Sequence, residues 1–272
     1  MCAESRRLIE ARAIAESVWQ LTDVFDFRAY LVVGNARAAL VDTMGGAGDV
    51  RASVSKITRL PLCTLLTHCH YDHVGGAYLL DDVRLPTGEA PAWDVVENHS
   101  ERAHAQAIEM GVVGEDALWA TSSRHRPQCA RVAEGDVIDL GHLTLHAVAL
   151  PGHTAGSMGY LCPERHLLFS GDAVTPIMCL FFENSLSIAA YRTTLAKMET
   201  LDFDAFWTGH HGVGFPRASL AGFDRVAAFA ERDEHGMKWV HGLLTEYEGT
   251  LHVPPEYQLA DADSPDFRAL IE

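Results

Sequence analysis

Short apolar runs, most of them ending in a tight polar loop, recur along the 272 residues of the chain. Alternation of apolar and polar positions, with turn residues between two such runs, predicts paired β-strands. The predicted strands are two hairpins at residues 28–42 and 158–170, with Gly34-Asn35 at the first turn, and single runs at residues 62–67, 143–150 and 203–207. The loops after these strands are rich in His, Asp and Gly, so we expect the chemistry of the protein at strand ends.

Helical spacing appears between the strands. Asp49 precedes apolar residues at helical intervals, residues 173–200 predict an apolar stretch and then a helix, and residues 218–232 predict a terminal helix. Residues 84–131 are polar and predict helices that cover the body. Strands with intervening helices favour two β-sheets covered by helices on their outer faces. We expect one domain over residues 1–272, with a core at about residues 18–232 and a C-terminal extension, residues 233–272, whose function the sequence does not indicate.

Composition narrows the class of protein. With 21 basic and 37 acidic residues the net charge is −16, which disfavours a nucleic-acid partner because such proteins cluster Lys and Arg. No apolar run reaches the roughly 18 residues of a membrane span, and charges interrupt the N-terminal segment where a signal peptide would be apolar. We therefore expect a cytoplasmic protein with a small-molecule substrate and no membrane partner. The six cysteines form no CxxC pair, which favours free thiols.

One loop carries a metal-ligand pattern. It reads His68-Cys69-His70-Tyr71-Asp72-His73, directly after the strand predicted at residues 62–67. Two histidines at i and i+2 of an extended segment point the same way, and the Asp and His that follow a turn can face a neighbouring point. Chance would give this pattern only about 0.003 times in such a chain.

Three single residues extend the pattern. They are His153 in Pro-Gly-His-Thr-Ala-Gly-Ser, Asp172 in Ser-Gly-Asp-Ala and His210 in Thr-Gly-His-His-Gly. Each follows an apolar strand, and the adjacent glycines let the backbone come close to a centre. Each residue alone is weak evidence for a metal ligand. Because all three occur in this order at strand ends, together they predict further ligands.

These motifs resemble those of the metallo-β-lactamase superfamily of HxHxDH type, over about residues 28–215. The resemblance implies a four-layer αββα sandwich of two mixed β-sheets flanked by helices, with a dinuclear metal site. It implies one metal on His68, His70 and His153, a second on Asp72, His73 and His210, and Asp172 as the bridging ligand. It also implies that Asp42, in Val-Asp-Thr-Met-Gly-Gly, orients the ligand loop.

The ligand set indicates hydrolysis. Five imidazoles and two carboxylates leave two divalent ions with net positive charge, so a bridging hydroxide forms near neutral pH and acts as nucleophile. Asp72 and Asp172 would orient groups and balance charge, and His211 would donate to a substrate oxygen or leaving group. Zinc fits best, although nitrogen and oxygen ligation also suits iron or manganese.

The sequence differs from several known members of the superfamily, and these differences favour a substrate with an ester-like bond. A thioester or a lactone is the first expectation. The chain has Thr175 where acyl-homoserine lactonases carry a tyrosine, and the bridging Asp172 is usually missing from true β-lactamases. Matches to the substrate-binding residues of glyoxalase II are not evident. The alternatives are an iron-dependent oxidoreductase of sulfur dioxygenase type and a non-catalytic metal-binding sensor.

Three weaker features remain. The apolar run at residues 174–182 would wall a substrate pocket, or else form core or the contact of a homodimer. Arg124-His125-Arg126, together with Arg131, forms a basic island that would attract a carboxylate or phosphate, or else lies in a solvated loop. Cys69 alternates with the two histidines beside it, so we expect it to turn away from the metal and pack.

Overall fold

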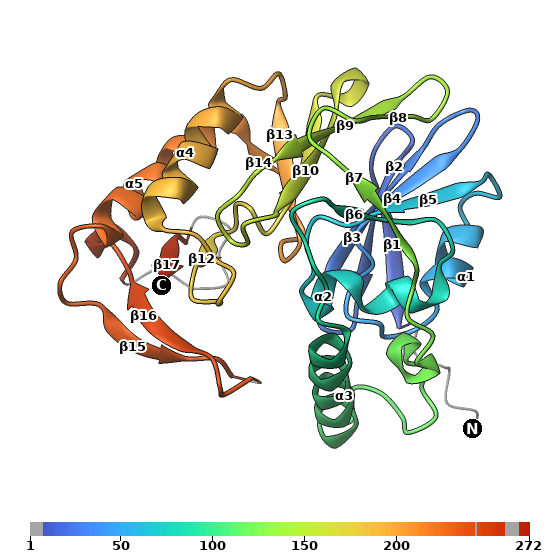
Figure 1. The fold of residues 1–272 in the computed structure, drawn as a ribbon, viewed down its shortest axis with the longest axis horizontal. Helices are drawn as coiled ribbons and strands as arrows, with labels where there is room; N and C mark the ends of the chain where they lie inside the picture. The colour runs from blue at the N-terminus through green and yellow to red at the C-terminus, as the bar shows by residue number, and fades with distance from the viewer. Residues whose placement is uncertain (1–7, 243, 259–266) are drawn as a thin grey trace.

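Two mixed β-sheets lie face to face, with helices on their outer sides (Figure 1). This computed structural model describes residues 8–242, 244–258 and 267–272. The first sheet has the order β1 (Ile9–Ala15), β2 (Val18–Asp23), β3 (Arg28–Val33), β4 (Ala38–Val41), β5 (Leu62–Leu65), β6 (Val83–Pro86) and β7 (Cys129–Val132). The second has the order β14 (Phe215–Pro216), β13 (Ala205–Thr208), β11 (Leu167–Gly171), β10 (Met158–Cys162), β9 (Thr144–Ala149) and β8 (Val137–Asp139).

The helices divide between the two outer faces. The α-helices are α1 (Val50–Ser55), α2 (Tyr71–Val74), α3 (Trp93–Glu109), α4 (Ile188–Glu199) and α5 (Leu220–Ala230). The 3-10 helices are η1 (Gly75–Leu79), η2 (Ala120–Ser123), η3 (Pro163–Arg165), η4 (Arg217–Ser219) and η5 (Pro255–Tyr257). Helices α1 and α3 share a buried apolar cluster with the first sheet, and α4 and α5 share another with the second. The four-layer αββα sandwich is therefore confirmed.

Side-chain alternation in the strands produces these layers. In β3, Tyr30 and Val32 face the cluster between the two sheets, whereas Leu31 faces the helices. Because successive side chains of a strand point to opposite faces, a strand buried on both sides reads as a continuous apolar run. The hairpins predicted at residues 28–42 and 158–170 are confirmed by the β3–β4 and β10–β11 pairings.

The expectation for residues 84–131 is partly wrong. This segment contains the helix α3, but β6 spans its start and β7 its end, and both belong to the first sheet. Each of these strands has only four residues; β6 is mostly buried and β7 is mostly exposed at the sheet edge, so neither is long enough to show a clear strand pattern in the sequence.

Three strands of the C-terminal extension and the earlier strand β12 (Ile177–Cys179) form a third sheet that the sequence did not predict. Its strands have the order β12, β17 (Ala269–Ile271), β16 (Glu248–His252) and β15 (Met237–Val240). The strand predicted at residues 203–207 overlaps β13, which β14, β15, β16 and β17 follow in the chain. Figure 1 shows this sheet beside α5, with β15 and β16 reaching toward α3. Among the described residues, no helix combines the length and the apolar character needed to span a membrane.

Buried tyrosines connect the two large sheets at the edge where the predicted ligands lie. The Tyr160 hydroxyl of β10 donates to the carbonyl of Leu66, 2.8 Å away, just after β5. The Tyr30 hydroxyl of β3 donates to the carbonyl of Thr208 at the end of β13, 2.6 Å away. These bonds fix the relative position of loops that belong to different sheets.

We predict that Tyr160→Phe destabilises the protein, because it removes a donor from the buried Leu66 carbonyl. The expected loss in the free energy of unfolding is about 1–3 kcal/mol, measured by denaturant unfolding. Tyr191→Phe is the matched control, since the buried Tyr191 hydroxyl has no hydrogen-bond partner among the described residues. An equal or larger loss in the control would contradict the role given to Tyr160.

Candidate metal centre

The loop that follows β5 presents four of the predicted ligands. His68 and His70 lie in its extended part, and the backbone of His70 is still extended where it precedes α2. Asp72 and His73 then lie on the single turn of α2. The change from extended chain to helix directs the first pair and the second pair of side chains to two neighbouring points.

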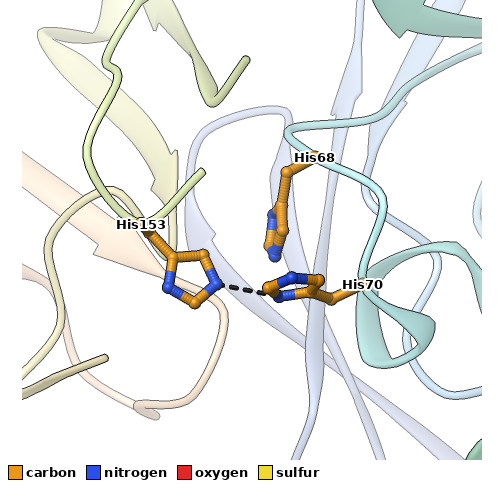
Figure 2. A group of neighbouring side chains, drawn as sticks. All are labelled: His68, His70 and His153. Carbon is orange, nitrogen blue, oxygen red and sulfur yellow. Dashed lines mark hydrogen bonds between the residues drawn. The ribbon is translucent and has the colours of Figure 1, made fainter. Parts of the chain in front are cut away.

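Three histidines form the first ligand group, drawn in Figure 2. Nε2 of His153 lies 2.9 Å from Nδ1 of His70, and the ring centres of His68 and His70 are 4.6 Å apart. Nδ1 of His153 lies 2.8 Å from the Cys179 carbonyl oxygen, to which it donates as N–H. This bond leaves the Nε2 lone pair of His153 directed at the group, as in many metal-ligating histidines.

The second ligand group consists of Asp72, His73, Asp172 and His210. Oδ2 of Asp172 lies 2.9 Å from Nε2 of His210, and Oδ2 of Asp72 lies 3.3 Å from the same nitrogen. Nε2 of His73 lies 3.4 Å from Oδ1 of Asp172. The four donors come from both sheets, because α2 follows β5 whereas Asp172 and His210 follow β11 and β13.

Asp172 lies between the two groups. Its Oδ2 is 2.9 Å from Nε2 of His210 in the second group and 3.9 Å from Nε2 of His153 in the first. Each group has the three or more nitrogen and oxygen donors that a divalent ion needs. The arrangement therefore fits a dinuclear site.

Asp42 supports the ligand loop from behind, as the resemblance implied. Its Oδ1 accepts the backbone N–H of Thr67 at 2.7 Å, and its Oδ2 accepts the Thr67 hydroxyl at 2.8 Å. The same Oδ2 lies 2.8 Å from Nδ1 of His73. The carboxylate thus holds His73 with Nε2 directed into the second group.

Glu89 supports the first group in a similar way, and the sequence did not indicate it. Its Oε2 accepts the backbone N–H of Cys69 at 2.9 Å, between the two histidines of the loop. Its Oε1 accepts the hydroxyl of Thr154 at 2.6 Å, next to His153. An isolated Glu in Thr-Gly-Glu-Ala carries no motif, so only the three-dimensional structure shows that one buried carboxylate joins both ligand loops.

Burial and neighbouring charges shift the histidine pKa values in opposite directions in the two ligand groups. Burial, with the neighbouring imidazoles, holds the pKa of His68 well below its usual value and lowers that of His70 to about 3. These rings are therefore neutral and offer lone pairs. Burial also opposes charge on His210, but Asp172 and Asp72 outweigh it and raise its pKa to about 10. In the second group, protons on the imidazoles balance the carboxylates.

Orphaned buried atoms show that the residues fit metal ions. Nε2 of His68 is buried and has no hydrogen-bond partner among the described residues, and Nε2 of His73 and Oδ1 of Asp172 face only each other, at 3.4 Å and without hydrogen-bond geometry. Leaving such atoms unpaired in a protein interior costs free energy. A cation at each group would give these atoms a partner and would replace the protons of the second group.

Two glycines allow the loops to approach the site. A Cβ on Gly209 would lie 2.4 Å from Cε1 of His73 and 2.7 Å from Oδ1 of Asp172. Gly171 has a φ of +52°, and a Cβ there would lie 2.4 Å from Oγ1 of Thr67. Larger residues at either position would displace ligands or the loop that carries them.

Two predicted residues lie outside the ligand groups. Cys69 belongs to the apolar cluster of the first sheet, which confirms its packing role. The ring of His211 lies against Phe215, with centres 5.7 Å apart, and burial with the nearby His210 lowers its pKa to about 4. A catalytic role for His211 stays a prediction.

The basic island and the apolar run at residues 174–182 have different surroundings in the structure. Arg124 and Arg126 both pair with Glu97 of α3, which neutralises the basic island at that helix. In the run at residues 174–182, Val174, Met178 and Leu180 are buried in the cluster of the second sheet, whereas the last residue, Phe182, lies at the ligands. The run is therefore core along most of its length and reaches the site only at its end.

The chain belongs to the metallo-β-lactamase superfamily, whose family model matches residues 28–210. It is 29% identical over 160 residues to human acyl-coenzyme A thioesterase MBLAC2, covering 53% of this chain and 57% of that protein. It is 28% identical over 208 residues to a hydroxyacylglutathione hydrolase of Cereibacter sphaeroides, covering 75% of this chain and 68% of that one. A metallo-β-lactamase family protein of Thermus thermophilus has the same fold, with a TM-score of 0.54 and 20% identity. The match covers 81% of this chain and 84% of that one.

We predict that Gly209→Ala weakens metal binding at the second group, because the added methyl displaces His73 and Asp172. Metal analysis of the purified variant should show fewer than two metals per chain, with the larger loss at the second group and a smaller one at the three-histidine group, which Asp172 also adjoins. Gly222→Ala on α5 is the control, since the nearest atom to a Cβ there is 3.7 Å away on a flexible arginine. Full occupancy in Gly209→Ala would contradict the close approach.

A second prediction compares Asp172, which lies between the two ligand groups, with His73, which belongs to the second group alone. Asp172→Ala should lower metal occupancy at both groups, whereas His73→Ala should keep one metal on the three histidines. Cys69→Ser should keep full occupancy, because its side chain packs in the core. Metal stoichiometry and thermal unfolding of the three variants test this, since bound metal stabilises the folded state. Two metals in Asp172→Ala together with loss in Cys69→Ser would show that the ligand assignment is wrong.

Proposed function

We propose that this protein is a dinuclear metal-dependent hydrolase that cleaves a thioester, with a lactone as the second candidate bond. One observation carries the proposal: Asp172 lies between two ligand groups that each offer three or more nitrogen and oxygen donors, with a buried His68 Nε2 that has no hydrogen-bond partner among the described residues. The similarity to a thioesterase and to a hydroxyacylglutathione hydrolase supports the choice of bond.

The ligand groups suit zinc best, and iron or manganese would also accept nitrogen and oxygen donors. Bound at the two groups, the ions would supply Lewis acidity and lower the pKa of water near the scissile carbonyl. The overall reaction adds water across the thioester: a C–O bond forms at the acyl carbon, the C–S bond breaks, and the sulfur leaves as a thiol with one proton of the water.

The chain's own residues position this chemistry. Burial opposes the charge of Asp72 and Asp172, but the nearby His73 and His210 hold both carboxyl pKa values below their usual range. Both side chains are therefore anionic ligands that balance metal charge. The ring of Phe182, 4.3 Å from that of His70, covers one side of the first group and restricts access of bulk water there.

The iron-dependent oxidoreductase is the alternative with a different chemistry. A mononuclear oxygenase would need only His68, His70, His153 and Asp172. The additional donors Asp72, His73 and His210 lie within one ligand group with Asp172, which favours two metals. Elemental analysis separates the two proposals, because two metals per chain support the hydrolase and one iron per chain supports the oxidoreductase.

We predict thioester hydrolysis with poor turnover of β-lactams and acyl-homoserine lactones. The hydroxyl of Thr175, at the position of the lactonase tyrosine, donates to the carbonyl of Ile177 at 2.7 Å, so it is directed into its own turn. Initial rates on thioester, lactone, phosphodiester and β-lactam substrates, with metal-stripped protein as control, test the proposal. Efficient β-lactam cleavage without thioester cleavage would overturn it.

A further inference from the structure

A continuous series of aromatic rings runs from the first ligand group to the second. We call these five residues, Phe182, Tyr247, His99, Tyr71 and Phe27, the aromatic belt. Successive ring centres along it are 5.1, 5.7, 5.9 and 5.8 Å apart. Phe182 lies 4.3 Å from the ring of His70, and Phe27 lies 5.5 Å from the ring of His210. The belt therefore spans the site from one metal position to the other.

One ring of the belt, that of Tyr247, comes from the C-terminal sheet. Tyr247 lies where β15 turns into β16, and its carbonyl accepts the N–H of His241 at 2.9 Å. Neighbouring residues attach this turn to the first sheet and its helix: Leu244 is buried in the first apolar cluster, and Glu246 pairs with Arg102 of α3. The turn is thus held across the site, with Tyr247 between Phe182 and His99.

We infer that the aromatic belt is the acyl-binding surface of the site and that Tyr247 makes the enzyme select thioesters with a flat apolar acyl group. This inference rests on the proposed function. Four of the five rings are only partly buried, although they lie beside a polar metal centre. Aromatic rings favour edge and offset contacts with another ring, so a planar acyl group would gain contacts that an acetyl group lacks.

The charge of the belt agrees with an uncharged acyl group. Burial outweighs the nearby Glu246 and lowers the pKa of His99, so its imidazole is neutral at pH 7. Arg102, a cation on the same helix as His99, is paired with Glu246. An acyl chain that carried its own charge would lose hydration on this surface without gaining a matched ion pair.

The test compares two thioesters of the same small thiol, phenylacetyl and acetyl, on metal-loaded protein. Tyr247→Leu keeps apolar bulk to hold the turn and removes the planar face. We expect it to lower kcat/KM for the phenylacetyl substrate about 10-fold or more and to change that for the acetyl substrate less than about 3-fold. Tyr247→Phe should resemble the natural protein. Equal changes on both substrates, or no change in Tyr247→Leu, would overturn the inference while leaving thioester hydrolysis intact.

Tyr257→Ala is the matched control. Tyr257 belongs to the same C-terminal segment, but its ring lies against Phe267 at 6.3 Å and packs with the cluster of the second sheet. This variant should leave the phenylacetyl-to-acetyl preference unchanged. Thermal unfolding and metal content of each variant separate a selectivity effect from loss of the fold.

A binding measurement separates this inference from the proposed function. Calorimetry with phenylacetate and with acetate reports on the surface even if the protein hydrolyses no thioester. Phenylacetate binding that weakens about 10-fold in Tyr247→Leu would support the belt, whatever bond the enzyme cleaves. Phenylacetate affinity that equals acetate affinity, or that Tyr247→Leu does not change, would overturn it.

Discussion

The metal centre depends on one buried carboxylate, that of Asp42. Asp42 follows β4 with a φ of +60° and accepts both the N–H and the hydroxyl of Thr67, which follows the parallel neighbour β5. Its contact with Nδ1 of His73 fixes the other end of the same loop. Because a buried carboxylate is tolerated only when its hydrogen bonds are satisfied, the position of Asp42 determines the position of the whole ligand loop.

The second sheet must bring its ligands to the same place. His153, Asp172 and His210 each follow a strand of that sheet, so the centre exists only where the ends of strands from both sheets meet. Backbone contacts across the sandwich hold this edge: the N–H of Met158 donates to the carbonyl of Thr67 at 2.9 Å, and that of Arg28 donates to the carbonyl of Gly209 at 2.9 Å. Packing between the sheets and the geometry of the ligands are therefore coupled.

The sequence predicted the parts that have a local signature. The ligands stand in motifs of histidine, aspartate and glycine at strand ends, and the central strands read as apolar runs because both of their faces are covered. The strand β6 is buried but only four residues long, and β7 and the strand β16 of the C-terminal sheet are short and in part exposed, so none of them has such a pattern. Glu89 and Tyr247 could not be predicted, because their roles come from contacts with residues far away in the chain.

The residues that would hold the metals and the residue that would select the substrate lie in different parts of the chain. All the predicted ligands lie within residues 28–210, the part that the family model matches, so this part carries the features common to the superfamily. Tyr247 lies beyond that part and reaches the site because Leu244 and Glu246 attach its turn to the first sheet and α3. A segment attached in this way can change in sequence without disturbing Asp42 or the ligand loop. Substrate choice can consequently vary within the fold while the metal centre stays the same.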